Sequence, residues 1–276
     1  MCRACSANVW RRRAIAAASG GHPQSEAGQP VTAGLLVIGN EILSGRTQDA
    51  NLAYLGHRLN EIGVRLAEVR VVPDIEADIV AAVNALRARF DYIFTTGGIG
   101  PTHDDITAAA IAKAFDVPLI QNPEARARLE DNYRAGDLNE ARLRMANTPE
   151  GATLIDNPVS TAPGFQIGNV FVMAGIPVIM QAMFESIVHR LVGGKPLLSR
   201  TFTVSLPEGK IAAGFGALQE TYPDVEMGSY PFSRDGRFAT RLVLRSSEED
   251  RLAAAAAELE AMIAGLGSTG VWDQTD

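Results

Sequence analysis

Two adjacent acids follow a glycine-rich turn in the segment TTGGIGPTHDDIT (95–107). Glycines allow backbone N–H groups to approach a ligand closely, and the first turn of a following helix adds a partial positive charge that attracts phosphate. Asp104 and Asp105 would repel such an anion. The residues alone therefore leave two interpretations open: a phosphate-binding turn, or a tight turn in which one of these acids caps a helix.

Three common nucleotide and nucleophile motifs do not fit this chain. A dinucleotide fingerprint that starts at Gly98 requires glycine at the position of His103, which we interpret as an ordinary loop histidine. A P-loop fails in VGGKP because Pro196 follows Lys195. The sequence has no G-x-S-x-G nucleophile elbow. The glycine turn must therefore be interpreted from its own surroundings.

Composition indicates a soluble globular protein. Of its 276 residues, 46% are apolar and 21% are charged, which is ordinary for such a protein, and the length allows one large domain and one small domain. The net charge of −7 argues against a nucleic-acid partner, and no apolar run approaches the roughly 20 residues that span a bilayer. Cys2 and Cys5 lack a second pair for a zinc site and fit a reducing cytoplasm, where we expect the protein to lie.

Strand and helix patterns alternate from residue 31 onward. Short apolar runs predict buried strands, and apolar residues at helical spacing predict helices. The expected strands are AGLLVIG (33–39), VRLAEVRVV (64–72) and DYIFTT (91–96), and the expected helices span 49–63, 75–90 and 105–115. This order predicts an α/β fold with a doubly wound, mostly parallel sheet, in which ligands bind at the carboxyl ends of the strands. The glycine turn and Asp74, the acid of VVPD, both lie at such ends.

The chain divides into three expected parts. Residues 1–31 lack hydrophobic periodicity, so we expect a disordered extension or an over-long start, although an Arg-rich, acid-poor start is also typical of an organelle presequence. Residues 32–194 form the expected α/β domain, and residues 195–276 form a second, smaller α+β domain.

The smaller domain has the expected order βαββα. An Asp235-Gly236 pair between two alternating runs predicts a hairpin. Ser247 and Asp250 resemble a capping box at the start of the last helix, which Gly265 or Gly267 ends. We interpret this domain as a packing or dimer-forming module.

Several segments together resemble a known family. TTGGIGPTHDDIT resembles the signature of the molybdopterin-binding domain family, which includes the MoaB and Mog proteins. The stretches IGNEILSGRTQDAN, NTPEGATLIDNPVSTAPGFQI and MAGIP support this resemblance, which covers about Thr32 to Leu191 and is nearest to the N-terminal part of the competence/damage-inducible protein A (CinA-like) family. The C-terminal amidase domain of longer members is absent from the sequence, so we expect no nicotinamide-nucleotide deamidation.

The resemblance implies a set of site residues. Asp105 and Asp74 match two acids that act in the Mog branch, and we expect them to be catalytic and, with Asp104, to bind a metal ion. The residues expected to bind the phosphorylated ligand are Thr96, Gly97, Gly98, Gly100, Pro101, Thr102, Glu41 and Gly175. The family's proline-glycine-proline-proline turn is replaced here by Ala174-Gly175-Ile176-Pro177, which changes one edge of the pocket.

A divalent cation would reconcile the acids with the phosphate, because Mg²⁺ prefers one or two carboxylates together with phosphate oxygens. We therefore expect Mg²⁺, Mn²⁺ or Co²⁺ as a cofactor, and molybdopterin or an adenine nucleotide as the phosphorylated ligand. Three functions remain: metal-dependent hydrolysis of a pyrophosphate such as ADP-ribose, molybdenum cofactor biosynthesis by adenylyl transfer or metal insertion, and ligand binding without turnover. Because relatives associate, we also expect a homo-oligomer.

Overall fold

The computed structural model describes residues 30–134, 137–234 and 237–273, so that most of the expected N-terminal extension and the Asp235-Gly236 turn lie outside the described residues. The chain divides into two compact units, Met1–Gly194 and Lys195–Asp276. Each unit has its own hydrophobic core.

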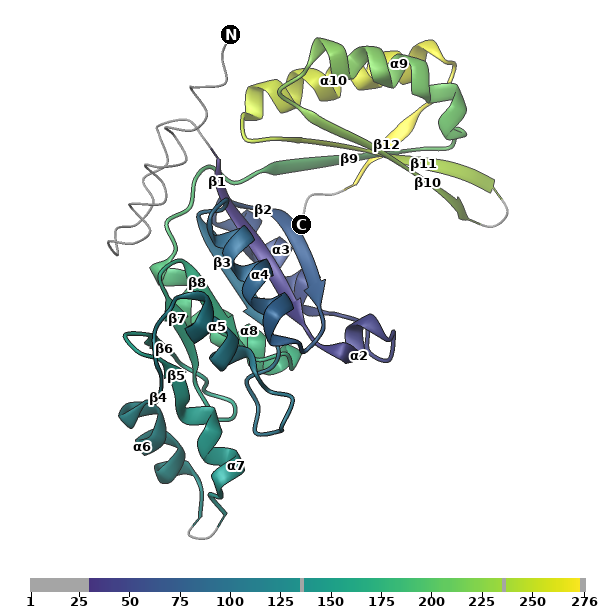
Figure 1. Ribbon diagram of the computed structural model, residues 1–276. Coiled ribbons are helices and arrows are strands. Elements are labelled where there is room, and N and C mark those ends of the chain that lie inside the picture. Colours follow the sequence, from purple (N-terminus) through teal and green to yellow (C-terminus); the bar gives the residue numbers. More distant parts are fainter. Residues whose placement is uncertain (1–29, 135–136, 235–236, 274–276) are drawn as a thin grey trace. The chain divides into compact units, whose positions relative to one another are not determined.

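The first unit is built on a six-stranded sheet with the order β2-β1-β3-β8-β7-β6 (Figure 1). Neighbouring strands are parallel from β2 to β8, and the last two pairs are antiparallel. The strands of this sheet are β1 (Val31–Ile38), β2 (Val64–Val72), β3 (Tyr92–Thr96), β6 (Thr153–Ile155), β7 (Gly164–Ile167) and β8 (Val170–Met173). The predicted α/β fold with a mostly parallel sheet is confirmed.

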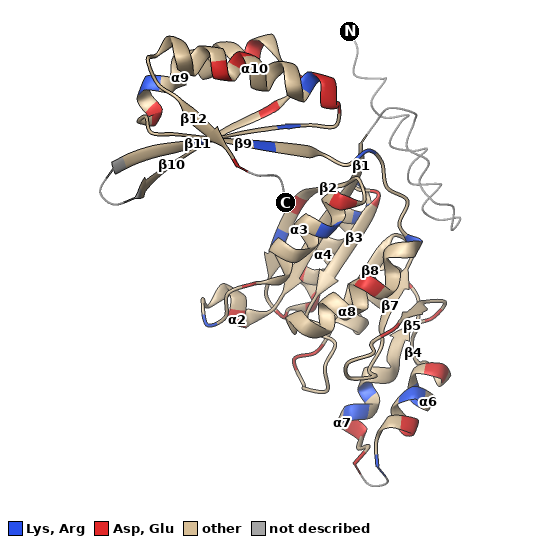
Figure 2. Ribbon diagram, turned by 180° about the vertical axis from the view of Figure 1, so that it is seen from behind, with Lys and Arg blue, Asp and Glu red and all other residues tan. Residues whose placement is uncertain are grey.

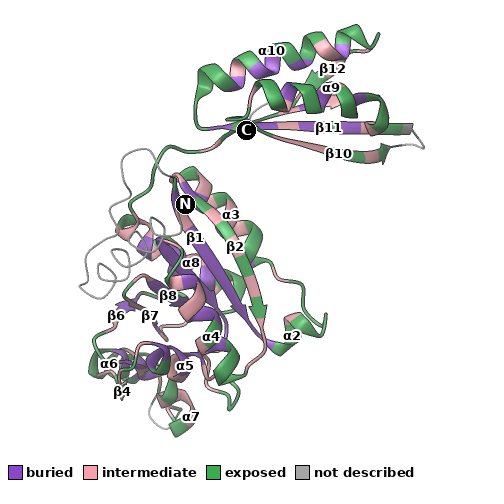
Figure 3. Ribbon diagram, turned by 45° about the horizontal axis from the view of Figure 1, so that its top comes forward, coloured by how far each residue is buried: buried purple, intermediate pink, exposed green. Residues whose placement is uncertain are grey.

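Burial explains the places of the strands. Every residue of β3 is buried, and β1 is buried except at Thr32, so both occupy the interior of the sheet. β2 has its side chains alternately more and less exposed, as suits an edge strand. The register pairs Ile38 with Val72 and Val37 with Thr96, which brings the carboxyl ends of β2, β1 and β3 together. Figure 3 shows the buried interior strands beneath more exposed helices.

Two pairs of helices supply the two faces of the sheet. One apolar cluster joins the sheet to α3 (Asn51–Glu61) and α8 (Pro177–Ile187), and its aromatic members include Phe94, Phe171 and Phe184. The opposite cluster joins the sheet to α4 (Glu76–Arg87) and α5 (Thr107–Ala114). The predicted covering of both faces by helices is therefore confirmed.

Residues 119–149 form an appendage for which no elements were predicted. It contains β4 (Leu119–Gln121), α6 (Pro123–Asn132), α7 (Glu140–Leu143), the 3-10 helix η1 (Arg144–Ala146) and β5 (Asn147–Pro149), and β4 pairs with β5 in a sheet of two strands. Charged residues of both signs mark α6 and α7 (Figure 2). The Asn122 side chain caps α6 by accepting from the N–H groups of Glu124 and Ala125.

The second unit has the order βαββαβ and a sheet with the order β10-β11-β9-β12. Its elements are β9 (Leu198–Val204), α9 (Glu208–Thr221), β10 (Glu226–Arg234), β11 (Arg237–Ser246), α10 (Glu249–Gly265) and β12 (Gly270–Trp272). The expected order βαββα omitted β12, because three residues are too few to produce a recognisable alternation. This is the split βαβ arrangement of ferredoxin-like folds.

The expected capping box at α10 is wrong. The helix follows Glu248, which makes no side-chain capping bond. The hydroxyl of Ser246, one residue before the expected Ser247, accepts from the N–H group of Glu248 instead. At the other end, Gly267 adopts a φ of 71°, in agreement with the expected glycine stop.

Backbone contacts fasten the last residues of the first unit. The N–H group of Gly194 donates to the carbonyl oxygen of Gly63 at 2.9 Å. A Cβ atom on Gly193 would lie 1.5 Å from the carbonyl oxygen of Ile62, so only glycine fits there. The hydroxyl of Tyr92 accepts from the N–H group of Val192 at 2.9 Å. The chain therefore leaves the first unit from a fixed point at the end of α3.

None of the helices that the structure describes is both long and apolar enough to traverse a membrane.

Candidate functional site

The candidate site lies at the carboxyl ends of β1 and β3, where the strand order reverses direction. β1 is flanked by β2 on one side and β3 on the other, so the crossovers that follow β1 and β3 leave toward opposite faces of the sheet. Such a switch point leaves a crevice outside the strand ends, where open α/β sheets bind ligands. The glycine turn begins in this position, directly after Thr96.

Gly97 and Gly98 are required by the backbone of the turn. Gly97 has a φ of 101°, and a Cβ atom on it would lie 2.2 Å from the carbonyl oxygen of Ile38 at the end of β1. Gly98 has a φ of 68°, and a Cβ atom there would lie 2.1 Å from Oγ1 of Thr107. Thr107, the first residue of α5, donates its hydroxyl to the Gly97 carbonyl oxygen and its N–H to that of Gly98, both at 3.0 Å. The turn is thus closed against the start of α5.

The amides of the turn are not equivalent. The N–H group of Gly97 donates to the carbonyl oxygen of Met173 in β8, so it is not available to a ligand. In the described part of the chain, the N–H groups of Gly98, Ile99 and Gly100 donate no hydrogen bond. Three successive unpaired amides in a turn with a left-handed residue form a concave site that favours an anion.

A second glycine turn, AGIP, touches the first. A Cβ atom on Gly175 would lie 3.2 Å from the Cα atom of Gly97. Nδ2 of Asn51, the first residue of α3, donates to the carbonyl oxygen of Gly175 at 2.8 Å. The two turns and the start of α3 therefore form one continuous edge of the crevice, even though Ile176 replaces the family's proline.

The acids after the turn do not cap α5. The residue before this helix is Ile106, and no side chain accepts from its first-turn amides. Instead, Oδ2 of Asp105 accepts from the N–H group of Thr102 at 2.8 Å and from its hydroxyl at 2.5 Å. The same oxygen would lie 2.7 Å from a Cβ atom on Gly100, so the carboxylate lies against the turn. The interpretation in which one of these acids caps the helix is therefore wrong, and Asp104 is separated from the helix start at Thr107 by two further residues.

Asp104 is a solvent-exposed anion beside this turn. The Thr102 side chain and the backbone amide of Asp104 itself hold the pKa of this carboxyl below its usual range. His103 lies 4.0 Å from Asp104, and its side chain is 94% exposed, which fits its interpretation as an ordinary loop residue. Asp104 therefore remains charged at neutral pH without helping the helix.

Asp74 and Glu41 lie at the neighbouring strand ends. Oδ2 of Asp74, which follows β2, accepts from the N–H group of Asn40 at 2.9 Å. Asn40 begins the short helix α2 (Asn40–Leu43), and the adjacent Glu41 folds its carboxylate over Gly39, where a Cβ atom would lie 2.6 Å from both of its oxygens. The ends of β1 and β2 thus place two more carboxylates at this edge of the sheet.

The acids that were expected to bind a metal ion do not form one cluster in the structure. Within residues 30–134, 137–234 and 237–273, no group of three or more His, Cys, Asp or Glu side chains is arranged to hold a metal ion. Asp74 and Asp105 nevertheless each have one oxygen held by a backbone N–H group and a second oxygen with no hydrogen bond among the described residues. This donor set fits a cation that takes one or two carboxylates and completes its coordination with phosphate oxygens and water.

Two buried polar atoms behind the turns have no hydrogen-bond partner. Thr96 is 1% exposed and Asn51 is 3% exposed. Oγ1 of Thr96 and Oδ1 of Asn51 are unpaired in the part of the chain that the structure describes. An unmet buried polar group costs about 1–3 kcal/mol unless a water or ligand satisfies it. Thr96 and Asn51 are thus buried directly behind the two turns.

Three residues of this region were missed by the sequence analysis. Asn51 holds the second glycine turn, Thr107 closes the first, and Arg144 donates to the carbonyl oxygen of Pro101 at 2.9 Å. Asn51 and Thr107 lie inside the segments that resemble the family, so their positions carried a signal. Arg144 lies in the appendage, and only the tertiary structure brings it to the turn.

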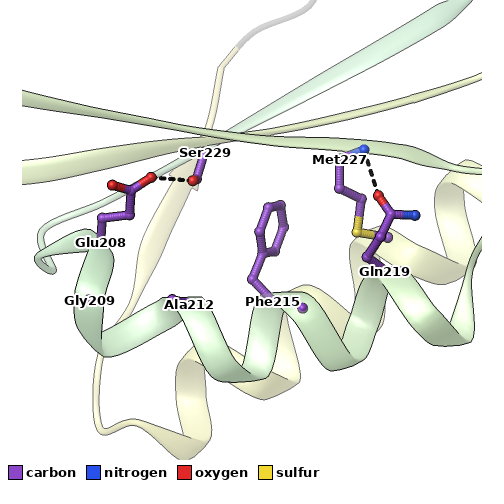
Figure 4. A pocket seen from close by; sticks show the side chains of 8 residues that line it. Glu208, Gly209, Ala212, Phe215, Gln219, Met227 and Ser229 are labelled. Atoms are coloured by element: carbon purple, nitrogen blue, oxygen red, sulfur yellow. Dashed lines mark hydrogen bonds between the residues drawn. The ribbon is translucent and has the colours of Figure 1, made fainter.

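The second unit has a separate open groove of about 420 Å³. It lies between α9 and the edge strand β10, with Phe215 and Met227 pointing into the space between them and the Glu208–Ser229 hydrogen bond at one end (Figure 4). Gly209 on its wall adds no side chain. Nothing in this groove resembles the acid and amide arrangement of the first unit.

Comparison with known proteins gives two family matches. Residues 34–197 match the family described as "Probable molybdopterin binding domain". Residues 196–267 match the family described as "FAD synthase, middle domain". The boundary between the two matches falls close to the division between the two compact units after Gly194.

Individual relatives agree with these matches. A protein of Pyrobaculum calidifontis is 37% identical over 211 residues, which cover 72% of this chain and 80% of the relative. A "CinA-like protein" of Desulfosudis oleivorans is 39% identical over 199 residues, and the match covers 66% of this chain but only 48% of that relative. The solved structure of the protein CinA "with unknown function" from Thermoplasma acidophilum is 33% identical, covers 58% of this chain and 98% of its own, and aligns with a TM-score of 0.56.

The resemblance inferred from the glycine turn and the DDIT acids is thus confirmed, including its CinA-like branch. Because the family match extends over residues 34–197, which hold the entire candidate site, the chain belongs to the probable molybdopterin-binding domain family.

Proposed function

We propose that this protein binds a phosphorylated adenine nucleotide or pterin at the glycine turn and hydrolyses a pyrophosphate bond with the aid of a divalent cation. ADP-ribose represents the substrate class. A water oxygen bonds to one phosphorus, the bond from that phosphorus to the bridging oxygen breaks, and AMP and ribose 5-phosphate leave. The protein would then be a metal-dependent nucleoside-diphosphate-type pyrophosphatase.

The observation that carries this proposal is the run of unpaired amides next to held carboxylates. The N–H groups of Gly98, Ile99 and Gly100 donate no bond within the described residues, and the Asp105 carboxylate lies against Gly100. Amides fixed before the ligand arrives stabilise charge on phosphate oxygens without reorganisation. Acids alone would suit a cation, and amides alone would suit an anion. Their combination supports a phosphate ligand that arrives with a metal ion.

Asp74 and Asp105 are the residues that would hold the cation. Each carboxylate keeps one oxygen in a hydrogen bond, to Asn40 or Thr102, which fixes its direction and leaves the other oxygen for a ligand. When bound, a divalent cation supplies positive charge that offsets the growing negative charge at an attacked phosphorus. Asp104, ionised and exposed, would act on the cation from a greater distance.

The chain's own groups then account for the remaining steps. The turn amides hold the phosphate oxygens, and the crevice edge formed by Gly97 and Gly175 fixes where the phosphate lies. The proton lost by the attacking water passes to solvent water, because one oxygen of Asp105 is held by Thr102 and the other is used by the cation.

The two family matches extend the range of substrates. FAD and ADP-ribose both contain an adenosine diphosphate ester, and the FAD synthase match at residues 196–267 supports FAD as a second pyrophosphate substrate. The match at residues 34–197 supports a pterin ligand, and with it the alternative of adenylyl transfer or metal insertion in molybdenum cofactor biosynthesis. A module that binds such a ligand without turnover is the third possibility.

One experiment separates these alternatives. The purified full chain is incubated with ADP-ribose, FAD, NAD or ATP, each with Mg²⁺, Mn²⁺ or Co²⁺ and with a chelator as control. We expect AMP release from ADP-ribose that depends on the cation. Pterin-dependent consumption of ATP would instead support cofactor synthesis, and tight binding without any product would support a binding module.

We further propose that the protein is a homo-oligomer. In the second unit, β10 is an edge strand whose outer side has no neighbour among the described strands, so an extra surface is available for association. Light scattering at micromolar concentration should give a multiple of 29.4 kDa. A mass near 29.4 kDa would show that the chain is a monomer.

A further inference from the structure

Arg144 reaches the glycine turn from a distant part of the chain. It begins η1 in the appendage, and its Nη2 atom donates a hydrogen bond of 2.9 Å to the carbonyl oxygen of Pro101. The residue is exposed. Among the described residues, no carboxylate lies within ion-pair distance of its guanidinium. Since a guanidinium has five N–H donors, most of them remain available beside the turn.

The position of this cation matters because the amides cover only part of a diphosphate. The unpaired N–H groups belong to residues 98–100, and Pro101, whose carbonyl oxygen Arg144 holds, follows immediately. Three successive amides suit the oxygens of one phosphate group. A second phosphate group would lie beyond them, in a region where Asp104 and Asp105 contribute negative charge.

We propose that Arg144 binds the second phosphate of the ligand and thereby selects diphosphates over monophosphates. The planar fork of arginine matches two phosphate oxygens at once, whereas a lysine would act as a point charge. The bond to Pro101 fixes the guanidinium at the end of the amide run, so the two anion-binding groups are adjacent. This inference rests on the proposed function only for the location of the first phosphate. It adds that the site recognises a second phosphate group in the ligand.

A purely structural role for Arg144 makes a different prediction. If Arg144 only holds the loop through Pro101, its loss should disturb the amides and weaken every phosphate ligand equally. If it binds the second phosphate, its loss should weaken pyrophosphate and leave inorganic phosphate nearly unchanged. The ratio of the two affinities therefore distinguishes the roles, and neither measurement requires turnover.

The experiment measures binding of inorganic pyrophosphate and inorganic phosphate to the full chain by calorimetry, with and without Mg²⁺. For Arg144→Gln we expect the pyrophosphate Kd to rise about 30-fold, as suits the loss of charge-assisted hydrogen bonds. The phosphate Kd should change by less than about threefold, within the normal scatter of surface substitutions. Arg144→Lys should recover part of the pyrophosphate affinity because it keeps the charge.

Arg142 provides a matched control two residues away. It also donates to a backbone carbonyl, that of Asp137, but its guanidinium lies 4.7 Å from the ring centroid of Tyr133 and not on the turn. Arg142→Gln should leave both affinities unchanged. The inference is overturned if Arg144→Gln weakens both ligands equally, if it weakens neither, if Arg142→Gln has the same effect, or if the unsubstituted protein does not distinguish pyrophosphate from phosphate. In that last case, cation-dependent AMP release would still decide the proposed hydrolysis separately.

Discussion

A turn glycine of the first unit and two helix glycines of the second unit occupy opposite surroundings. In the first unit, a Cβ atom on Gly97 would lie 2.2 Å from a backbone oxygen of β1, and the residue has a φ of 101°. In the second unit, Gly209 and Gly216 lie inside α9, where a Cβ atom would meet nothing within 4 Å. Glycine within a helix is about 1 kcal/mol less favourable than alanine. The fold therefore requires the first glycine and tolerates the other two at a loss of stability.

The difference shows what a glycine-rich sequence can and cannot indicate. The turn after β3 needs glycine because strand ends and the start of α5 converge there, whether or not a ligand binds. The glycines of this turn therefore indicate a crowded connection between β3 and α5, and they are not by themselves evidence for a ligand. Evidence for phosphate comes instead from the unpaired amides of residues 98–100 and the carboxylate of Asp105 beside them.

The largest expected effect tests the required glycine. Gly97→Ala should destabilise the protein by about 3–5 kcal/mol, because it combines a left-handed φ with a collision against the backbone of Ile38. Urea unfolding followed by circular dichroism measures this change. A loss below about 1 kcal/mol would show that the turn can relax, and the contrast with α9 would disappear.

The next effect separates chemistry from packing within the same turn. Asp105→Asn keeps an acceptor for the N–H group of Thr102 but removes an anionic oxygen, so the fold should persist while activity falls about a hundredfold, or roughly 3 kcal/mol. Asp104→Asn should reduce activity only a few-fold. The measurement is the rate of cation-dependent AMP release from ADP-ribose. Equal and small losses at both positions would contradict our assignment of Asp105.

A smaller effect of opposite sign is expected in the second unit. Gly216→Ala should stabilise α9 by about 0.5–1 kcal/mol, because the new methyl group meets open space and the unfolded chain loses freedom. Hydrogen exchange of the α9 amides, measured on the full chain, reports this local change. Gly214→Ala is the matched control and should not stabilise the helix, since its Cβ atom would lie 2.9 Å from the Met262 sulfur.

The smallest expected effect concerns residues before the first strand. A shortened chain that begins at Gln29 should melt at the same temperature as the full chain, because hydrophobic periodicity starts only near Val31. We expect the stability of both units to be unchanged by this removal. A large drop in the melting temperature would show that the removed residues pack on one of them.

The regular part of the first unit was predictable from local patterns. The strand expected at 64–72 matches β2, and the helix expected at 75–90 contains α4 with ends that differ by a few residues. These elements have strong periodicity and clear ends, so the chain near each residue carries enough information. The appendage at 119–149 was not predictable in the same way, because its two strands are three residues long and depend on pairing with each other, which local patterns do not reveal.

The candidate site was predictable in its members but not in its contacts. Asp105 follows the glycines in the sequence and could have been a helix cap, but in the structure its carboxylate accepts from Thr102 within the loop. An aspartate side chain can bond to a nearby backbone N–H group either at a helix start or within a loop. The sequence spacing of the residues is the same in both cases, so it could not decide between a cap and a loop. The contact of Arg144 with Pro101 could not be predicted for another reason. The two residues are 43 positions apart in sequence, and only the folded appendage brings them together.

The fastening at the end of the first unit has a consequence for how such chains diversify. The N–H group of Gly194 is bonded to the Gly63 carbonyl oxygen and that of Val192 to the Tyr92 hydroxyl, and Gly193 lies against the Ile62 carbonyl, so contacts within the first unit hold its last residues. Whatever follows Gly194 can be exchanged or deleted without removing any of these contacts. Recombination at this point would therefore join a different second unit to the same site. An insertion before Val192 would instead disturb the contacts that hold the end of the first unit.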